Sequence, residues 1–172
     1  MQERSEPVVG SVETFEDFYR REYPSVVALA LALSGSRWIA EELAQEAFIA
    51  AHRNWPKVAG YDLPGAWVRR VVTNLSVSTI RRRIVETRAL LHLGLGERPR
   101  EPEQPPGDSA FWEAVRSLPR RRSQVVALHY LEDLPVAEIA EVLEMAPGTV
   151  KKHLHDGRQQ LAQRLRLQEE EA

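Results

Sequence analysis

The stretch PVAEIAEVLEMAPGTVKKHL, residues 135–154, has the pattern of a helix-turn-helix. Such a motif needs apolar side chains that hold its first helix to a core, and Ile139 is placed for this. It also needs a small residue where the two helices cross, which is Ala140, and an apolar anchor on the second helix, which is Val150. Pro147 suits the first turn of that second helix. The stretch therefore predicts two helices joined by a short turn.

The second of these helices carries hydrogen-bonding and basic side chains in its first half. Such side chains reach base edges in the major groove, while lysines pair with phosphates. An ordinary helical hairpin with a basic outer face is the alternative, but spacing and charge together favour duplex DNA. His153 and His155 lie two residues apart and so point to different faces, which excludes a metal pair. The candidate duplex-binding residues are Thr149, Lys151, Lys152, His153, His155 and Arg158.

A second basic stretch, residues 66–84, holds five arginines and no acidic residue. On one helix Arg70, Asn74 and Ser78 share a face, because they are spaced four residues apart. Aromatic rings stack on unpaired bases, amides read base edges and arginines bind the backbone, so this surface suits opened strands. For Trp67 taken alone, burial in the core is the commoner outcome. The candidate residues are Trp67, Arg70, Asn74, Ser78, Arg81, Arg82 and Arg83.

A third motif, EELAQEAF at residues 41–48, is acidic and polar. Its candidate stripe for a basic partner helix consists of Glu42, Gln45, Glu46 and Phe48. A metal site formed by Glu42, Glu46 and His52 is the competing interpretation. His52 lies about 80° away from Glu42 around the helix, and no second acidic helix supplies matching ligands. We therefore expect no metal ion here.

Composition limits the remaining possibilities. The chain has 172 residues, a net charge of −2 and no cysteine, which suits one or two small domains in a reducing compartment and excludes thiol chemistry. The longest apolar run, residues 26–33, is far shorter than the roughly 20 residues of a membrane span. The N-terminus has no signal-peptide core, so we expect a cytoplasmic protein. No catalytic constellation or phosphate-binding loop is present, and we expect no catalytic residue, metal or cofactor.

Helical periodicity divides the chain into three segments. Residues 12–84 predict three amphipathic helices, and residues 110–168 predict the helices around the helix-turn-helix. Between them, residues 85–109 are rich in proline and glycine, and dense proline cannot sustain a helix. We therefore predict an all-α fold of two small helical domains, joined by a flexible proline-rich linker. The domains are expected to tumble independently, with first proteolytic cleavage at Arg98 or Arg100.

In this order the motifs resemble those of sigma factors of bacterial RNA polymerase, of the extracytoplasmic-function class and close to its compact actinobacterial subgroup. Residues 42–48 are similar to the helix that docks on the polymerase clamp. Residues 66–83 are similar to the helix that melts and reads the −10 promoter element. Residues 118–151 are similar to the domain that binds the −35 element, although Glu144 stands where glycine is usual in the turn.

The resemblance implies sigma region 2 at residues 12–84, a linker at 85–109 that threads the polymerase, and sigma region 4 at 110–168. Region 2 would hold four helices, which the sequence accommodates if residues 37–55 are split. The implied function is promoter-directed transcription initiation, with RNA synthesis left to the polymerase. The implied partners are core RNA polymerase (β′ clamp and β flap), promoter DNA and an anti-sigma factor, with no membrane insertion.

Two other classes of protein remain to be weighed. A stand-alone helix-turn-helix regulator would share residues 149–154, but it would need an α/β phosphoacceptor domain or a ligand pocket in its N-terminal segment, where no strands are predicted. A small helical hydrolase or metal enzyme would need a ligand set that the sequence lacks. Binding to core polymerase, followed by transcription from a cognate promoter, separates the three.

Overall fold

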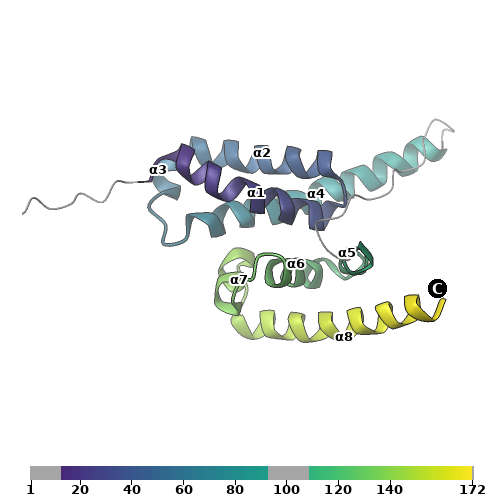
Figure 1. Ribbon diagram of the computed structural model, residues 1–172. Coiled ribbons are helices and arrows are strands. Elements are labelled where there is room, and N and C mark those ends of the chain that lie inside the picture. The colour runs from purple at the N-terminus through teal and green to yellow at the C-terminus, as the bar shows by residue number, and fades with distance from the viewer. Residues whose placement is uncertain (1–12, 93–108, 172) are drawn as a thin grey trace, which may run out of the picture.

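A computed structural model describes residues 13–92 and 109–171, without the side chains of residues 80, 81, 83, 84, 87, 88, 90, 91 and 168–171. Every regular element in these two ranges is a helix, so the predicted all-α fold is confirmed. Figure 1 shows α1–α4, the N-terminal domain, lying over α5–α8, the C-terminal domain. The helices are α1 (Phe15–Ser34), α2 (Arg37–Arg53), α3 (Trp55–Val58), α4 (Pro64–His92), α5 (Ser109–Arg116), α6 (Arg120–Tyr130), α7 (Val136–Leu143) and α8 (Pro147–Glu171).

Local sequence fixes the ends of the first two helices. The hydroxyl oxygen of Thr14 accepts a hydrogen bond from the backbone N–H of Asp17, which caps α1. The helix ends at Gly35, whose φ of 68° lies in the left-handed region that glycine adopts without strain. The hydroxyl of Ser36 then caps α2 by accepting from the N–H of Ile39. Residues 34–36 therefore end one helix and begin the next.

The N-terminal domain has one helix more than periodicity predicts. The short α3 begins with Pro56 in its first turn and is too brief to give a periodic signal. The last helix, α4, continues past Val85, where the linker was predicted to begin, and ends at His92. The remaining linker residues, with the expected cleavage sites Arg98 and Arg100, lie outside the described residues.

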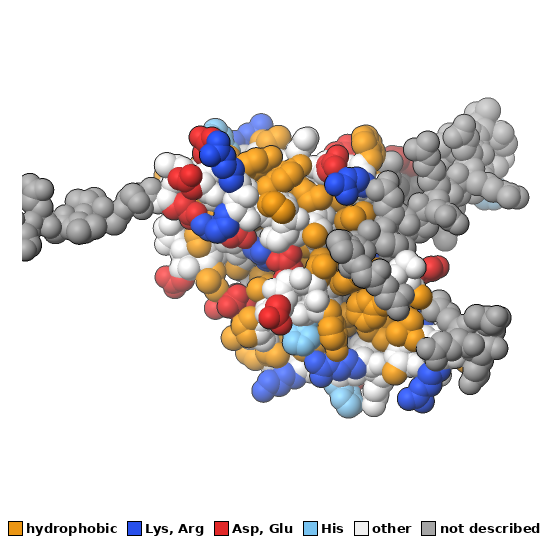
Figure 2. Space-filling model, in the orientation of Figure 1, with side chains coloured by type: hydrophobic (Ala, Val, Ile, Leu, Met, Phe, Trp, Pro, Cys, Tyr) orange, Lys and Arg blue, Asp and Glu red, His pale blue; other side chains and the backbone are white. Residues whose placement is uncertain are grey.

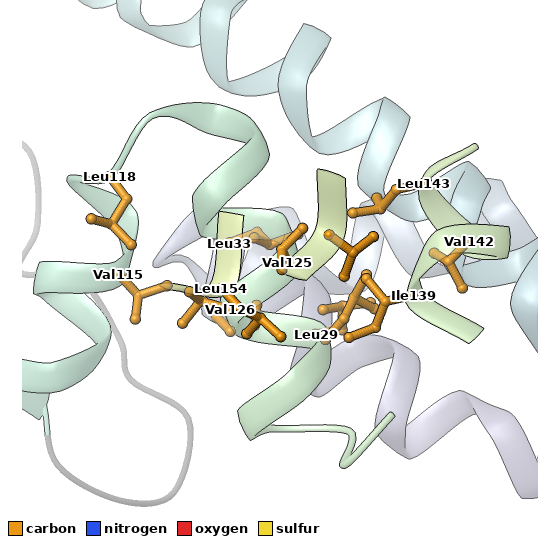
Figure 3. Close-up of a cluster of buried hydrophobic side chains, with 14 of the residues drawn as sticks. Leu29, Leu33, Val115, Leu118, Val125, Val126, Ile139, Val142, Leu143 and Leu154 are labelled. Carbon is orange, nitrogen blue, oxygen red and sulfur yellow. The ribbon is translucent and has the colours of Figure 1, made fainter. Parts of the chain in front are cut away.

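Two clusters of buried apolar side chains form the interior, and α1 contributes to both. Its Val26, Ala30 and Leu31 pack with α2 and α4. On another face of the same helix, Leu29 and Leu33 are buried among side chains of α5–α8. Figure 3 shows these two leucines beside residues of the C-terminal domain. The two domains therefore share a core, and the expectation that they tumble independently is wrong for the chain in this arrangement.

The C-terminal domain is tightly packed where α8 crosses α6. A Cβ atom placed on Gly157 of α8 would lie 2.8 Å from Cγ2 of Val126, a side chain with no solvent exposure. Real Cβ atoms do not approach so closely, so a larger residue would force the two helices apart. This contact fixes the position of α8, whose first half carries the candidate duplex-binding residues.

Candidate nucleic-acid interface

The helix-turn-helix predicted from residues 135–154 is formed by α7, a turn and the start of α8. Its three predicted anchors lie in the core, because Ile139 and Val150 have no exposed surface and Ala140 is 8% exposed. Burial of these three residues holds α7 against α8 and directs the opposite side of α8 outward.

The turn between these helices contains Glu144 in the left-handed conformation, with a φ of 52°. Its N–H donates to the carbonyl oxygen of Glu141 and so closes α7. A residue with a side chain is destabilised by about 1–2 kcal/mol of conformational free energy in this conformation, whereas glycine is not. The sequence already marked Glu144 as unusual here, and the structure shows that the backbone does take the conformation for which glycine is the easy choice.

The first half of α8 presents most of the candidate duplex-binding residues to solvent. Figure 2 shows basic and histidine side chains gathered over α8. The exposed members are Thr149, Lys151, Lys152, His155 and Arg158. His153 is partly buried, and its Nδ1 atom has no hydrogen-bond partner among the described residues. The two histidines therefore do point to different faces, and His155 is the one that is available to a ligand.

Arg158 is held by its own domain. Its Nε donates to the hydroxyl of Tyr130 at 2.9 Å, and its guanidinium carbon lies 5.8 Å from the centre of that ring. Its Nη2 lies 3.2 Å from Nε2 of His129. These contacts orient the exposed guanidinium beside the recognition surface.

The candidate strand-reading residues on α4 divide into exposed and covered groups. Asn74, Ser78 and Arg82 are exposed, and Arg82 forms an ion pair of 3.7 Å with Glu86 one turn away. Trp67 is partly buried against the core of the N-terminal domain, as expected for a large aromatic residue. The side chains of Arg81 and Arg83 lie outside the described residues.

Arg70 is turned toward the C-terminal domain. Its guanidinium donates to the carbonyl oxygens of Glu141 and Val142 at 2.6 and 3.3 Å, and to the carboxylate of Glu144 at 2.9 Å. The two carbonyls belong to the last turn of α7, where a cation is stabilised by the unpaired acceptors and the helix dipole. Arg70 thus has the helical spacing that puts it on one face with Asn74 and Ser78. Its side chain is partly buried, however, whereas theirs are exposed.

Arg69, which the sequence analysis did not single out, is a buried charged group at the contact between the domains. Its Nη1 donates to the carboxylate of Glu22 at 2.7 Å, and its Nε to that of Glu132 at 2.8 Å. A third donor, Nη2, reaches Oγ of Ser25 at 2.9 Å. No local pattern marks this residue, because its acidic partners lie 47 and 63 positions away in the chain.

These contacts shift the pKa values of Glu22 on α1 and of Arg69 on α4. Burial by itself raises the pKa of Glu22, but the hydrogen bonds and charges of Arg69 and Arg21 lower it below its ordinary value of 4.5. Burial alone lowers the pKa of Arg69, but the charge of Glu132 and the hydrogen bonds that Arg69 donates to both glutamates raise it above its ordinary value. Arg69 therefore stays charged, and the low pKa of Glu22 keeps the pair ionised at neutral pH.

A buried amide completes the polar contacts between the domains. Gln124 of α6 is 1% exposed, and its Nε2 donates to the carbonyl oxygen of Thr73 at 3.0 Å. Thr73 belongs to α4 and is fully buried. A buried polar group is tolerated only when it is hydrogen-bonded, so this contact selects one register of α6 against α4.

On α2 the predicted docking stripe is exposed except at one position. Glu42, Gln45 and Glu46 face solvent. Phe48 does not, since it is 3% exposed and packs against aromatic side chains of α1. Its neighbour Ile49 is a large apolar residue that is exposed, and both Ile49 and Phe48 line a hollow. Phe48 supports the stripe from beneath instead of presenting its ring.

Other kinds of site are not formed by the described residues. Within residues 13–92 and 109–171, no three histidine, aspartate or glutamate side chains are grouped as metal ligands. His52, considered above as a ligand, packs with its ring 4.8 Å from that of Phe15. None of the helices in these ranges has the length and apolar character to span a bilayer.

Comparisons with known proteins agree with this arrangement. The family model for sigma-70 region 2 matches residues 18–84, and the model for sigma-70 region 4 matches residues 108–161. The RNA polymerase sigma-E factor of Streptomyces coelicolor is 30% identical over 158 residues, which cover 86% of this chain and 83% of that protein. The chain belongs to the sigma-70 family. It is therefore related to transcription initiation factors over nearly its whole length.

One further relative and one solved structure are similar to this chain. The ECF RNA polymerase sigma factor SigE of Mycolicibacterium smegmatis is 34% identical over 161 residues, which cover 88% of this chain but 61% of that protein. The solved structure of the sigma factor RpoE from Bartonella quintana, in complex with the anti-sigma factor NepR, covers 88% of this chain and 96% of its own, with a TM-score of 0.70 and 22% identity. The first match supports the extracytoplasmic-function class, and the second supports the fold.

Proposed function

We propose that this sigma factor binds core RNA polymerase and directs it to promoters through two DNA contacts. The observation that carries the proposal is the ordered pair of sigma regions, with the first half of α8 exposed and with α2 exposed on the other side of the molecule. In this proposal α8 binds the −35 duplex, α4 melts and reads the −10 element, and the polymerase alone synthesises RNA. The chain then works in the cytoplasm without cofactor or metal.

An anti-sigma factor is a further proposed partner. The Bartonella quintana relative was solved in complex with one. The exposed hollow on α2 and the acidic stripe beside it give this chain a surface that a second protein can cover.

Run-off transcription tests the proposed function directly. Core polymerase with this chain is expected to give discrete transcripts from genomic promoter fragments, and core polymerase alone is not. A stand-alone regulator would bind duplex fragments without the polymerase and would support no such transcripts, so that result would refute the proposal.

Reversing one charge of the docking stripe should weaken binding to the polymerase. Glu46 is exposed on α2, so Glu46→Lys should leave the fold intact but place a positive charge against a basic partner helix. We expect core affinity to fall about tenfold or more, measured by titration of labelled core polymerase. Glu16→Lys, an equal charge change at an exposed site on α1, is the control. Equal affinities for Glu46→Lys and the parent would contradict docking through α2.

Substitutions at the two proposed DNA contacts should affect different steps of initiation. Lys151 lies near the start of α8 and is exposed, so Lys151→Ala should weaken duplex binding by the holoenzyme. If the lysine contacts a base, discrimination at one position falls by about 1–3 kcal/mol. Asn74→Ala should instead leave closed-complex formation nearly intact and lower the yield of open complex, because Asn74 is expected to act on opened strand.

A promoter with a pre-melted −10 bubble identifies the role of Asn74. If Asn74→Ala still fails on this template, the amide reads a base, and if the bubble restores activity, its role is in melting. Parent-like activity on both the duplex and the bubble would show that the strand-reading face of α4 has been placed wrongly.

A further inference from the structure

We propose that Tyr130 and His129 of α6 are positioning residues that aim the guanidinium of Arg158 at a phosphate group of duplex DNA. Arg158 lies on α8 and shares an exposed face of that helix with Lys151 and His155. The inference deepens the duplex contact proposed above for α8 and rests on it. It goes further by assigning Arg158 to the DNA backbone instead of to a base, and by naming the residues that fix its direction.

The two α6 side chains bind one edge of the guanidinium plane. Nε of Arg158 donates to the hydroxyl oxygen of Tyr130 at 2.9 Å, and Nη2 lies 3.2 Å from Nε2 of His129. The hydrogen of Nε and one hydrogen of Nη2 point the same way, so these two acceptors occupy one of the two forks that an arginine presents. The other fork, formed by Nη1 and the second hydrogen of Nη2, has no acceptor among the side chains that the structure describes. This free fork can bind a phosphate group through two parallel hydrogen bonds.

The protonation state of His129 follows from its two partners. Nδ1 lies 3.3 Å from the carbonyl oxygen of Leu134, which can only accept, so the ring hydrogen is on Nδ1. The guanidinium of Arg158 can only donate, so Nε2 is the acceptor of that hydrogen bond. Both contacts form together only when the ring is neutral and in this tautomer. His129 therefore holds the arginine in place without adding a charge of either sign.

Neutral partners leave the charge of Arg158 available to an anion. The hydroxyl of Tyr130 and the neutral ring of His129 compensate no charge. Arg122, near the start of α6, differs in this respect, because its Nη2 lies 3.2 Å from the carboxylate of Asp156. That carboxylate already compensates the charge of Arg122. Of these two arginines at the contact of α6 with α8, Arg158 is therefore the one suited to a phosphate group.

The ring of Tyr130 is fixed by its own neighbours. Phe111 of α5 packs against it edge-on with the ring centres 5.8 Å apart, and the ring of His129 does so at 5.0 Å. Tyr130 is nevertheless 48% exposed, so its hydroxyl meets Arg158 at the surface. A side chain whose direction is already set loses less conformational freedom on binding. Preorganisation of the guanidinium is what the two α6 residues contribute.

A purely structural role, in which this contact fastens α6 to α8, is the competing explanation. The two helices are already held by apolar burial, since Gly157 lies against Val126 and since Val150 and Leu154 enter the core. Arg158 is exposed, and contacts between a cation and an aromatic ring at exposed sites contribute little stability. The contact therefore adds little to the fold, but it directs a free donor fork outward.

The salt dependence of binding to a random-sequence duplex tests the phosphate contact. Each phosphate that a protein neutralises contributes about 0.9 to the slope of log affinity against log salt. The full chain with Arg158→Ala should lose about 0.9 of this slope and bind about tenfold more weakly at low salt. Arg166→Ala removes the same charge from an exposed site about two turns further along α8 and should leave the slope unchanged. An unchanged slope in Arg158→Ala, or an equal loss in Arg166→Ala, would overturn the phosphate contact.

Tyr130→Phe tests the positioning role, because it keeps the ring and removes the hydroxyl. We expect this variant to bind the duplex roughly threefold more weakly than the parent, with an unchanged urea midpoint. In the Arg158→Ala background the same substitution should have no effect on affinity, since the hydroxyl acts only through the arginine. An equal loss in both backgrounds, or no loss in the parent background, would overturn the positioning role of Tyr130.

The ring of His129 gives a readout in the free chain. We expect nitrogen NMR of the labelled chain at neutral pH to show the ring hydrogen on Nδ1, with the resonance assigned by its loss in His129→Gln. That variant keeps an acceptor and should bind the duplex nearly as the parent does, whereas His129→Leu should bind about as weakly as Tyr130→Phe. A ring hydrogen on Nε2, or parent-like binding by His129→Leu, would overturn the role of His129.

Run-off transcription separates this inference from the proposed function. The duplex and NMR measurements use the chain alone, so they give a result whether or not core polymerase is bound. A lowered slope in Arg158→Ala without polymerase-dependent transcripts would refute the proposed function and leave the phosphate contact standing. Discrete transcripts from the parent, together with an unchanged slope in Arg158→Ala, would refute the inference and leave the function standing.

Discussion

Replacing Arg69 with methionine is expected to lower the free energy of unfolding by about 3–5 kcal/mol. The change keeps most of the side-chain volume but leaves Glu22 and Glu132, whose side chains are 14% and 4% exposed, without their shared cation. Breaking a buried ion pair by removing one partner is costly because the remaining charge stays desolvated. Urea denaturation followed by circular dichroism measures the loss.

Arg82→Met is the matched control on the same helix. Arg82 also pairs with a glutamate, but the side chains of that pair are 66% and 59% exposed, so we expect a loss of about 0.5 kcal/mol or less. Equal losses in the two variants would show that the Arg69 contacts carry no special stability. A lower denaturant slope in Arg69→Met would further indicate that the domains no longer unfold together.

The pH dependence gives this first prediction a second readout. Arg69 lowers the pKa of Glu22 in the folded chain, so the stability that comes from this pair is present above the ordinary pKa of 4.5 and is lost as pH falls through the lowered value. The stability gap between parent and Arg69→Met should therefore narrow below about pH 4.5. A gap that stays constant from pH 7 into this range would contradict the assigned partners.

Leu29→Ala should lower the free energy of unfolding by about 2–5 kcal/mol, because the side chain is fully buried and its removal leaves a cavity. Leu43→Ala, in the core of the N-terminal domain alone, should cost a similar amount. Leu167→Ala is the surface control, since this leucine is 53% exposed, and should change stability by about 0.5 kcal/mol or less.

Hydrogen exchange distinguishes the two buried leucines. Leu29 lies in the cluster shared with the C-terminal domain, so Leu29→Ala should speed exchange in α6 as well as in α1. Leu43→Ala should act mainly on α1, α2 and α4. Unchanged protection of α6 in Leu29→Ala would contradict a core shared between the domains.

The parts of the fold that sequence alone predicts well are those fixed by neighbouring residues. The anchors of the helix-turn-helix and the start of α8 at Pro147 follow from spacing and proline chemistry, and the structure contains both. The unusual backbone at Glu144 also follows, because the motif leaves only a turn there. Of the candidate site residues, the exposure of Lys151, Lys152 and Asn74 agrees with their predicted surface positions.

The contacts between distant segments were harder to foresee. The pairing of Arg69 with Glu132 needs two domains to meet, and helical periodicity cannot specify that meeting. One signal was available, however, in the apolar run at residues 26–33. A helix that is apolar on all sides is buried on all sides, and this run supplies both cores. The prediction that Phe48 belongs to an exposed stripe was wrong, because a motif match does not say which face of a helix is covered.

The left-handed conformation of Glu144 affects which substitutions the chain can accept at this position during evolution. A codon for glutamate becomes one for glycine by a single base change, and Glu144→Gly would remove the carboxylate from Arg70 while relieving the backbone strain at the same position. Loss of a contact between domains usually lowers stability, but here relief of the backbone strain would offset that loss at the same position. Position 144 is therefore a point at which the contact between the two domains can weaken in a population with little penalty to the folding of the protein.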